Sequence, residues 1–280
     1  MESFTIKKVL NNNVLIAEHE SFQEVVLIGK GIGFGKKKGE TITDNTIEKM
    51  FVLKNEKEQE QYKMLLPFIE EDMIAVVSEV IDFITKKVGI PLHEHIHISL
   101  TDHITFAIKR IKQGMGINNP FLVETKTLYP KEYDIAKEVV DLINERLDVT
   151  LPEGEIGFIA LHIHSALTNR SLSEVNRFSQ LISRLMNIIE DTMKIKIDKE
   201  SVNYMRLVRH LQHTIERVLK GEAVEEPEKI TLLLKNEYPV CYNTAWKMIK
   251  VMQQTLKKPV YDAEAVYLTM HLYRLKKKAL

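Results

Sequence analysis

An internal repeat constrains the fold of this 280-residue chain more than any other feature of its sequence. The segment 126–136 (KTLYPKEYDIA) matches the segment 235–245 (KNEYPVCYNTA), with both tyrosines, the proline and the last alanine in register. Apolar residues recur at helical spacing through both copies, which is typical of amphipathic helices that bury one face. The repeat therefore predicts two tandem all-α domains, each a helical bundle, over residues 59–172 and 173–280.

Two histidines of each repeat occupy matched positions. Imidazole titrates near neutral pH and is nucleophilic, so four matched histidines could accept phosphoryl groups or bind metal ions. A structural histidine that was duplicated with the rest of the domain would leave the same pattern, so spacing alone keeps both explanations open. The residues that fall in register are His103 with His210, Arg110 with Arg217, Glu155 with Glu264 and His162 with His271.

The remaining histidines do not recur, which argues against a metal site. The segment 93–97 (HEHIH) formally fits the zinc-protease pattern H-E-x-x-H near an expected helix start. The second repeat has no counterpart, and Tyr273 stands where the first repeat has His164. Triad catalysis needs a serine or cysteine nucleophile beside a histidine, and the single Cys241 has no matched histidine nearby. We therefore expect no metal site, no catalytic site and no cofactor.

Residues 1 to about 54 differ from the repeats and predict a small antiparallel β-sheet or barrel. Short β-branched runs, separated by asparagine and glycine clusters, are typical of hairpins. The charged segment 55–60 (NEKEQE) is the expected hinge, so the N-terminal module is predicted to span residues 1–58. The expected strands lie near residues 4–10, 14–17, 24–28 and 50–53.

Five of the eleven glycines lie in the segment 29–39 (GKGIGFGKKKG). Neither glycine motif for nucleotides fits, because lysine stands at positions 30 and 37 of the phosphate-loop pattern and at position 36 of the dinucleotide pattern. The loop instead combines lysines, which neutralise phosphates, with Phe34, which can stack on a base. It indicates a surface that binds nucleic acid, while a solvated charged hairpin fits the same composition.

Overall composition limits how the chain could bind a nucleic acid and where it acts. The 39 basic and 39 acidic residues cancel, so a nucleic acid must be held by a local patch. No apolar run approaches the ~18 residues that span a bilayer, and the N-terminus lacks the apolar core of a secretory signal. The single cysteine excludes an internal disulfide and fits a reducing compartment. We expect a cytoplasmic protein without membrane insertion.

Several segments resemble the BglG/SacY/LicT family of transcriptional antiterminators. Segments 7–15 (KKVLNNNVL) and 26–37 (VLIGKGIGFGKK) are similar to that family's co-antiterminator RNA-binding module, and the duplicated helical unit is similar to its phosphotransferase-system (PTS) regulation domain. Segment 154–170 (GEIGFIALHIHSALTNR) most resembles the glucose-specific members. The resemblance covers essentially the whole chain.

The resemblance implies that a homodimer binds an imperfect hairpin in leader mRNA and prevents a terminator from forming upstream of a sugar permease gene, here one for glucose. The sugar-specific PTS permease (enzyme II) would phosphorylate the first repeat and inactivate the protein when glucose is absent. The phosphocarrier HPr is the candidate donor for the second repeat. The implied RNA contacts are Lys8, Asn13, Gly29, Lys30, Gly31 and Phe34, and the implied phosphorylation sites are His103, His162, His210 and His271.

One departure from the family and two other functional classes stay open. Many members have arginine where Lys30 stands, and lysine keeps the charge but loses the planar bidentate fork. A DNA-binding transcription activator can carry the same regulatory repeats, but its helix-turn-helix module would replace the strands expected in residues 1–54. A phosphotransfer enzyme would pass its phosphoryl group to an acceptor, whereas a regulator holds it.

Overall fold

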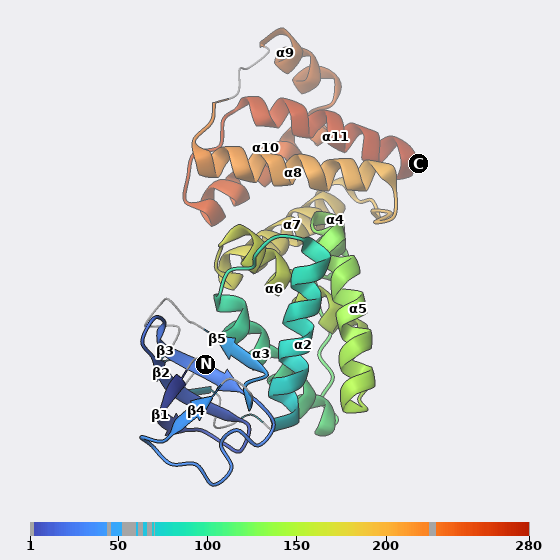
Figure 1. Cartoon of the computed structure of the whole chain (residues 1–280). Coiled ribbons are helices and arrows are strands. Elements are labelled where there is room, and N and C mark those ends of the chain that lie inside the picture. Colours follow the sequence, from blue (N-terminus) through green and yellow to red (C-terminus); the bar gives the residue numbers. More distant parts are fainter. Residues whose placement is uncertain are drawn as a thin grey trace. The chain divides into compact units, whose positions relative to one another are not determined.

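The computed structural model describes residues 3–43, 46–51, 60, 64–65, 69, 71–223 and 228–279. The chain divides into two compact units (Figure 1). The first comprises Met1–Ile117 and Ile135–Asn169, and the second comprises Asn118–Asp134 and Arg170–Leu280. Among the described residues, no helix is both long enough and apolar enough to cross a membrane.

The first unit begins with an antiparallel sheet whose strand order, within the described ranges, is β4-β1-β2-β3-β5. It confirms the four predicted strands, except that Val52 and Leu53 of the last one lie outside the described residues. The sequence pattern does not predict β4, because its single buried residue, Ile42, makes too short a run to alternate. The strands are β1 (Ser3–Val9), β2 (Val14–His19), β3 (Gln23–Ile28), β4 (Thr41–Thr43) and β5 (Lys49–Phe51).

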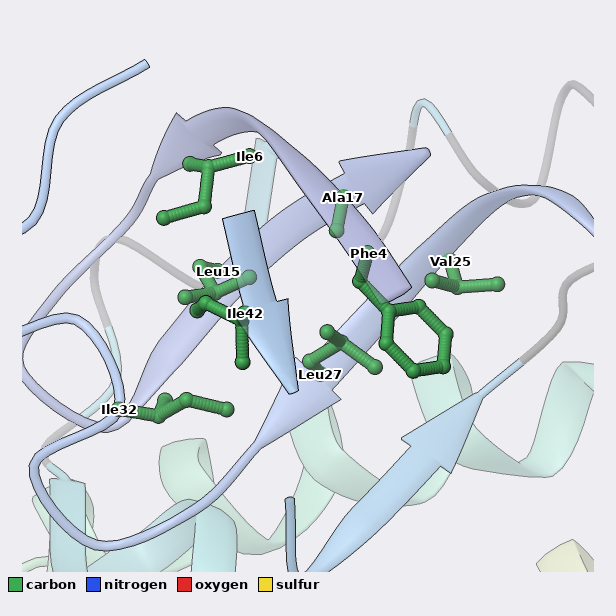
Figure 2. Close-up of a cluster of buried hydrophobic side chains, with 8 residues drawn as sticks. All are labelled: Phe4, Ile6, Leu15, Ala17, Val25, Leu27, Ile32 and Ile42. Atoms are coloured by element: carbon green, nitrogen blue, oxygen red, sulfur yellow. The ribbon is translucent and has the colours of Figure 1, made fainter. Parts of the chain in front are cut away.

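A cluster of apolar side chains forms the core of the sheet (Figure 2). Side chains alternate between the two faces of a strand, so Phe4 and Ile6 are buried while Thr5 between them is exposed. Ile32 joins the same cluster from the glycine loop, which ties that loop to the core. The cluster contains Phe4, Ile6, Leu15, Ala17, Val25, Leu27, Ile32 and Ile42.

The helical part of the first unit is arranged around α3, which packs against α2 and α6. In α3 the buried positions Ile96, Leu100 and Ile104 recur every four residues and form the inward face. The helices of the first repeat are α2 (Glu71–Val88), α3 (His95–Lys112), α4 (Leu122–Leu128), α5 (Pro130–Leu147) and α6 (Glu153–Thr168).

The second repeat has the same order of helices, which confirms the predicted duplication. In the second unit α8, α10 and α11 lie side by side (Figure 1); α11 packs against both of the others, and α7 packs against α10. By sequence register, α8 corresponds to α3, α10 to α5 and α11 to α6. These helices are α7 (Leu172–Met193), α8 (Val202–Lys220), α9 (Glu228–Glu237), α10 (Pro239–Leu256) and α11 (Ala263–Ala279).

The Tyr-Pro pair shared by the two repeats marks a helix start. Pro130 is the first residue of α5, and Pro239 is the first residue of α10. Proline suits this position because its fixed φ is helical and its missing N–H has no intrahelical partner there anyway. The conserved spacing in the repeat therefore encodes where these two helices begin.

The short helix α4 packs differently from its counterpart α9. Helix α4 contacts α7 and α8 within the second unit, whereas α9 contacts α10 and α11. The fully buried Glu124 of α4 forms an ion pair with Lys199 at 2.9 Å. The two copies of one repeated element have thus taken two packing arrangements.

Candidate functional site

In the first repeat, α3 and α6 bring the matched histidines His103 and His162 together. Their ring centroids are 4.9 Å apart. The side chain of His103 is 17% exposed, while His162 is only 4% exposed. His103 is therefore the more exposed of the two histidines.

A buried carboxylate lies beside His103. Glu155 stands two helical turns before His162 on α6, and Arg110 stands two turns after His103 on α3, so each faces the histidines. The Oε2 atom of Glu155 lies 2.9 Å from Nε2 of His103, and its Oε1 lies 3.0 Å from the guanidinium of Arg110. Nε2 of His103 and Oε2 of Glu155 are both buried, and the structure gives neither atom a hydrogen bond to another group.

The second repeat builds the same arrangement from α8 and α11. The ring centroids of His210 and His271 are 4.8 Å apart. Nε2 of His210 lies 3.4 Å from Oε2 of Glu264, whose Oε1 lies 2.6 Å from the guanidinium of Arg217. Thr214 adds a hydroxyl that donates to Glu264 at 2.9 Å.

The two sites differ at the position of this hydroxyl. At the register that matches His103 with His210, Thr214 corresponds to Ala107. The hydroxyl of Thr214 also lies 3.5 Å from Nε2 of His210. The second site is therefore the more polar of the two around its carboxylate.

The surroundings of these sites keep two of the histidines neutral. Burial lowers the pKa of His162 well below its usual value, and the nearby His103 and His95 lower it further. Burial also lowers the pKa of His271 to about 4, with a further lowering by His210, Arg274 and Arg206. A neutral imidazole keeps the lone pair that a phosphoryl acceptor needs.

The carboxylate of the second site stays ionised. Burial alone would raise the pKa of Glu264, but the nearby His210, hydrogen bonds from Arg217 and Thr214 and the charge of Arg217 outweigh burial and lower it. A buried negative charge thus lies beside His210 at neutral pH.

In the sheet, the predicted RNA contacts gather where the β1–β2 turn meets the glycine loop. The side-chain oxygen of Asn13 accepts a hydrogen bond from the backbone N–H of Gly31 at 2.6 Å. The backbone oxygen of Asn13 accepts one from Gly29 at 3.0 Å, and that of Asn12 accepts one from Gly33 at 2.8 Å. The hydrogen bonds to Asn13 therefore fix the conformation of the glycine loop.

Glycine is required at two of the predicted contact positions. A Cβ atom at Gly29 would overlap the backbone oxygen of Thr46, and Gly31 has a φ of +69°, which L side chains rarely adopt. These glycines shape the loop whether or not their backbone also touches RNA.

The remaining predicted contacts present side chains to solvent. Phe34 is 75% exposed, an unusual position for a large aromatic side chain. Lys30 and Lys8 are also exposed, and the residue next to Lys8, Val9, lies against Gly33 of the loop. An exposed aromatic between lysines suits stacking on a base and pairing with phosphates.

The zinc-protease pattern does not take the helical form that zinc binding would need. Helix α3 begins at His95, so His93 precedes the helix and does not share a helical face with His97. In the parts of the chain that the structure describes, no group of three or more histidine, cysteine, aspartate or glutamate side chains is arranged to hold a metal ion.

The repeat pairs Glu155 with Glu264 and Arg110 with Arg217, but the sequence alone assigned none of these residues to a site. The structure adds them to the histidine pairs through the distances given above. Their register in the repeat was the available signal, because four charged residues kept the same spacing from the histidines in both copies.

Comparison with protein families matches two kinds of domain. The family model described as the PRD domain matches residues 78–166 and 183–275, and the one described as the CAT RNA binding domain matches residues 4–60. The CAT RNA binding domain matches the part of the chain that forms the β-sheet. This excludes a DNA-binding activator, which would have a helix-turn-helix module there.

Named relatives match along nearly their whole length. The PtsGHI operon antiterminator of Bacillus subtilis (strain 168) is 64% identical over 276 residues, which are 99% of this chain and 98% of the relative. The GlcA/glcB genes antiterminator of Staphylococcus carnosus (strain TM300) is 45% identical over 274 residues, 97% of this chain and 96% of the relative.

A solved structure supports the same assignment. The crystal structure of GlcT CAT-PRDI is 63% identical and covers 60% of this chain and 99% of its own, with a TM-score of 0.54. On these matches, the chain belongs to the BglG/SacY/LicT family of transcriptional antiterminators, which join a CAT RNA-binding domain to two PRD domains.

Proposed function

We propose that this antiterminator controls a glucose permease gene of the phosphotransferase system and responds to phosphorylation of its histidines. Relatives named for the PtsGHI operon and for the glcA and glcB genes support this target. The protein binds a hairpin in the leader mRNA as a homodimer in the cytoplasm. It is a regulator that holds its phosphoryl groups, and not an enzyme that passes them on.

The observation that carries the proposal is the histidine pair beside a buried carboxylate, built twice from corresponding helices. We propose that the sugar permease phosphorylates the first repeat and inactivates the protein when glucose is absent, and that HPr acts on the second repeat. The phosphorylated residues are His103, His162, His210 and His271.

The charge of a phosphoryl group is large enough to act as a switch. A phosphoryl group on a hydroxyl residue adds roughly −1.5 to −2 charges, and we extend this value to histidine. Moving a population from 1:99 to 99:1 takes about 5.5 kcal/mol, which one or two such charges at a packed interface could supply.

The RNA-binding surface in this proposal comprises the exposed side chains Lys8, Lys30 and Phe34. Asn13, Gly29 and Gly31 complete it by fixing the path of the loop. The proposed domains span residues 1–58, 59–172 and 173–280. The first boundary lies outside the described residues, and the short helix α4 of the first repeat packs in the second unit.

A reporter gene behind the leader tests the proposal. The His103→Ala/His162→Ala double variant is expected to give antitermination without glucose, whereas His103→Asp is expected to weaken RNA binding. His93→Ala and His213→Ala, at histidines that do not recur in the repeat, serve as matched controls and should keep normal regulation. Expression that stays fully glucose-dependent in the double variant would contradict the assignment.

A gel shift tests the RNA target separately. The full chain is expected to bind the leader hairpin and not the corresponding duplex DNA. Equal binding to both would argue against the proposed target.

A further inference from the structure

The two ring nitrogens of His103 have different surroundings. Nε2 is closed to solvent, although 17% of the side chain as a whole is exposed. The exposed part of the ring therefore does not include Nε2. A phosphoryl donor that approaches from solvent meets the other side of the ring.

The carboxylate of Glu155 also distinguishes the two ring nitrogens, because it lies beside Nε2. Oε2 of Glu155 lies 2.9 Å from Nε2, and the glutamate side chain is only 2% exposed. A phosphoryl group on Nε2 would place its negative oxygens against this buried carboxylate, without water to screen the repulsion. The site would have to open before Nε2 could carry a phosphoryl group.

We propose that Glu155 and Glu264 are positioning residues, which hold Nε2 of His103 and of His210 and leave Nδ1 as the nitrogen that accepts the phosphoryl group. The inference rests on the proposed function, since it concerns how these histidines are phosphorylated. It adds which atom reacts and which residues select it.

The carboxylate selects the atom by fixing the imidazole tautomer. The partner of one ring nitrogen decides which nitrogen carries the proton. A carboxylate beside Nε2 favours a proton there, so the lone pair of the neutral ring lies on Nδ1. An aspartate orients a catalytic histidine in the same way in serine proteases.

The transfer step balances without an additional acid or base. The donor is a phosphohistidine or phosphocysteine side chain of a phosphotransferase-system protein. The lone pair of Nδ1 forms the new N–P bond while the P–N or P–S bond of the donor breaks, and that bonding pair leaves with the donor side chain. The proton on Nε2 of His103 stays in place, and the positive charge that the ring gains faces the carboxylate of Glu155.

Arginine keeps the carboxylate in position. The second oxygen of Glu155 lies 3.0 Å from Arg110, so rotation of the carboxylate away from the ring would break an ion pair. The same arrangement occurs in the second repeat, where Glu264 lies 2.6 Å from Arg217. In both repeats a carboxylate that is paired with an arginine lies beside Nε2 of the histidine, at 2.9 Å in the first and 3.4 Å in the second.

The position of the phosphoryl group can be measured directly. The full chain, labelled with 15N-histidine, is phosphorylated with the phosphorylated permease, and long-range 1H–15N correlations distinguish the Nδ1 from the Nε2 isomer. Spectra of the His103→Asn variant identify the signals of His103. We expect the Nδ1 isomer at His103 in the unmodified sequence.

Substitution of the carboxylate tests its role. Glu155→Ala is expected to slow phosphorylation of His103 at least about tenfold and to yield both isomers, while His210 remains unaffected as an internal control. Glu155→Gln keeps the side-chain shape and is expected to act in the same direction, which covers the case in which the alanine variant does not fold. Glu153→Ala removes an exposed carboxylate from the same turn of α6 and should change neither rate nor isomer.

Two outcomes would overturn the inference alone. One is the Nε2 isomer at His103 in the unmodified sequence, and the other is an unchanged rate and isomer in both Glu155 variants. If no histidine of the unmodified protein accepts a phosphoryl group, the proposed function fails together with the inference. These measurements therefore distinguish a failure of this inference from a failure of the proposed function.

Discussion

The carboxylate of Glu264 lies 2.6 Å from the guanidinium of Arg217, with only 2% of the glutamate side chain exposed. A charge at that depth is unfavourable unless a partner of opposite charge compensates for its lost hydration. The pair also joins α8 to α11, the two helices that carry His210 and His271. The geometry of the histidine site therefore depends on a buried ion pair.

The corresponding pair in the first repeat gives a stability prediction. Arg110→Met keeps most of the side-chain volume but leaves the carboxylate of Glu155 buried without its arginine. Loss of one partner of a buried ion pair costs about 3–5 kcal/mol. We expect a decrease of this size in the free energy of unfolding, measured by urea denaturation of the full chain.

An exposed ion pair in the same unit is the matched control. Lys87 lies 2.6 Å from Glu138, with both side chains more than 40% exposed. Lys87→Met is expected to change the free energy of unfolding by at most about 1 kcal/mol. Equal effects of the two substitutions would mean that burial does not govern the Arg110 pair.

The exposed aromatic of the glycine loop gives a prediction about RNA affinity. Phe34 is 75% exposed, so Phe34→Ala should leave the melting temperature of the protein unchanged. Loss of stacking on one base costs about 1–3 kcal/mol, which weakens binding roughly 5- to 150-fold. The dissociation constant for the leader hairpin, measured by fluorescence anisotropy, tests this.

Phe22 provides the control for this substitution. It is 39% exposed and stacks on His19 beyond the end of β2, in a part of the sheet with none of the predicted RNA contacts. Phe22→Ala should keep the affinity for the hairpin. A decrease as large as that of Phe34→Ala would indicate a general loss of exposed apolar surface.

The repeat predicted the helical half of the fold because duplication leaves a register that can be found in a single sequence. The same register identified the four matched histidines, and it also aligned Glu155 and Arg110 with their counterparts in the second repeat. Sequence could not identify these two as site residues, because a charged residue on a helix is usually solvated. Their burial arises only when α3 packs against α6.

Two elements were beyond sequence reasoning for other reasons. Strand β4 has one buried residue, Ile42, and exists through pairing with β1 rather than through its own pattern. Helix α4 has the same place in its repeat as α9, yet it packs against α7 and α8. Local sequence does not specify which neighbours a short helix contacts.

The glycine loop gives a prediction about backbone shape. A Cβ atom at Gly29 would overlap the backbone oxygen of Thr46, which cannot move aside as a flexible side chain can. Such overpacking typically costs 1–3 kcal/mol, so we expect Gly29→Ala to lower the free energy of unfolding by about that amount. RNA affinity in the same gel shift should fall as well, because the displaced loop contains Gly31, which hydrogen-bonds to Asn13.

Gly116→Ala is the matched control for that change. A Cβ atom at Gly116 meets no heavy atom within 4 Å, and its φ is not in the left-handed region. Neither stability nor RNA affinity should fall in this variant. If Gly29→Ala behaves like Gly116→Ala, the close approach of the loop to Thr46 is not required.

The half-buried His271 gives a prediction about pH. Its pKa is lowered to about 4 in the folded protein, mainly by burial, from 6.5 in an unfolded chain. Between these pH values the unfolded chain binds a proton that the folded chain does not, so stability is present above pH 6.5 and is lost as the pH falls toward 4. Between pH 7 and pH 5 the loss due to this residue is about 1–2 kcal/mol, allowing for solvent screening.

Urea denaturation at both pH values tests this prediction. The difference in stability between the two pH values should be smaller for His271→Gln than for the unmodified protein. His213→Gln, at an exposed position on α8, should keep the full difference. An identical pH dependence in all three proteins would contradict the assignment of a neutral imidazole to His271.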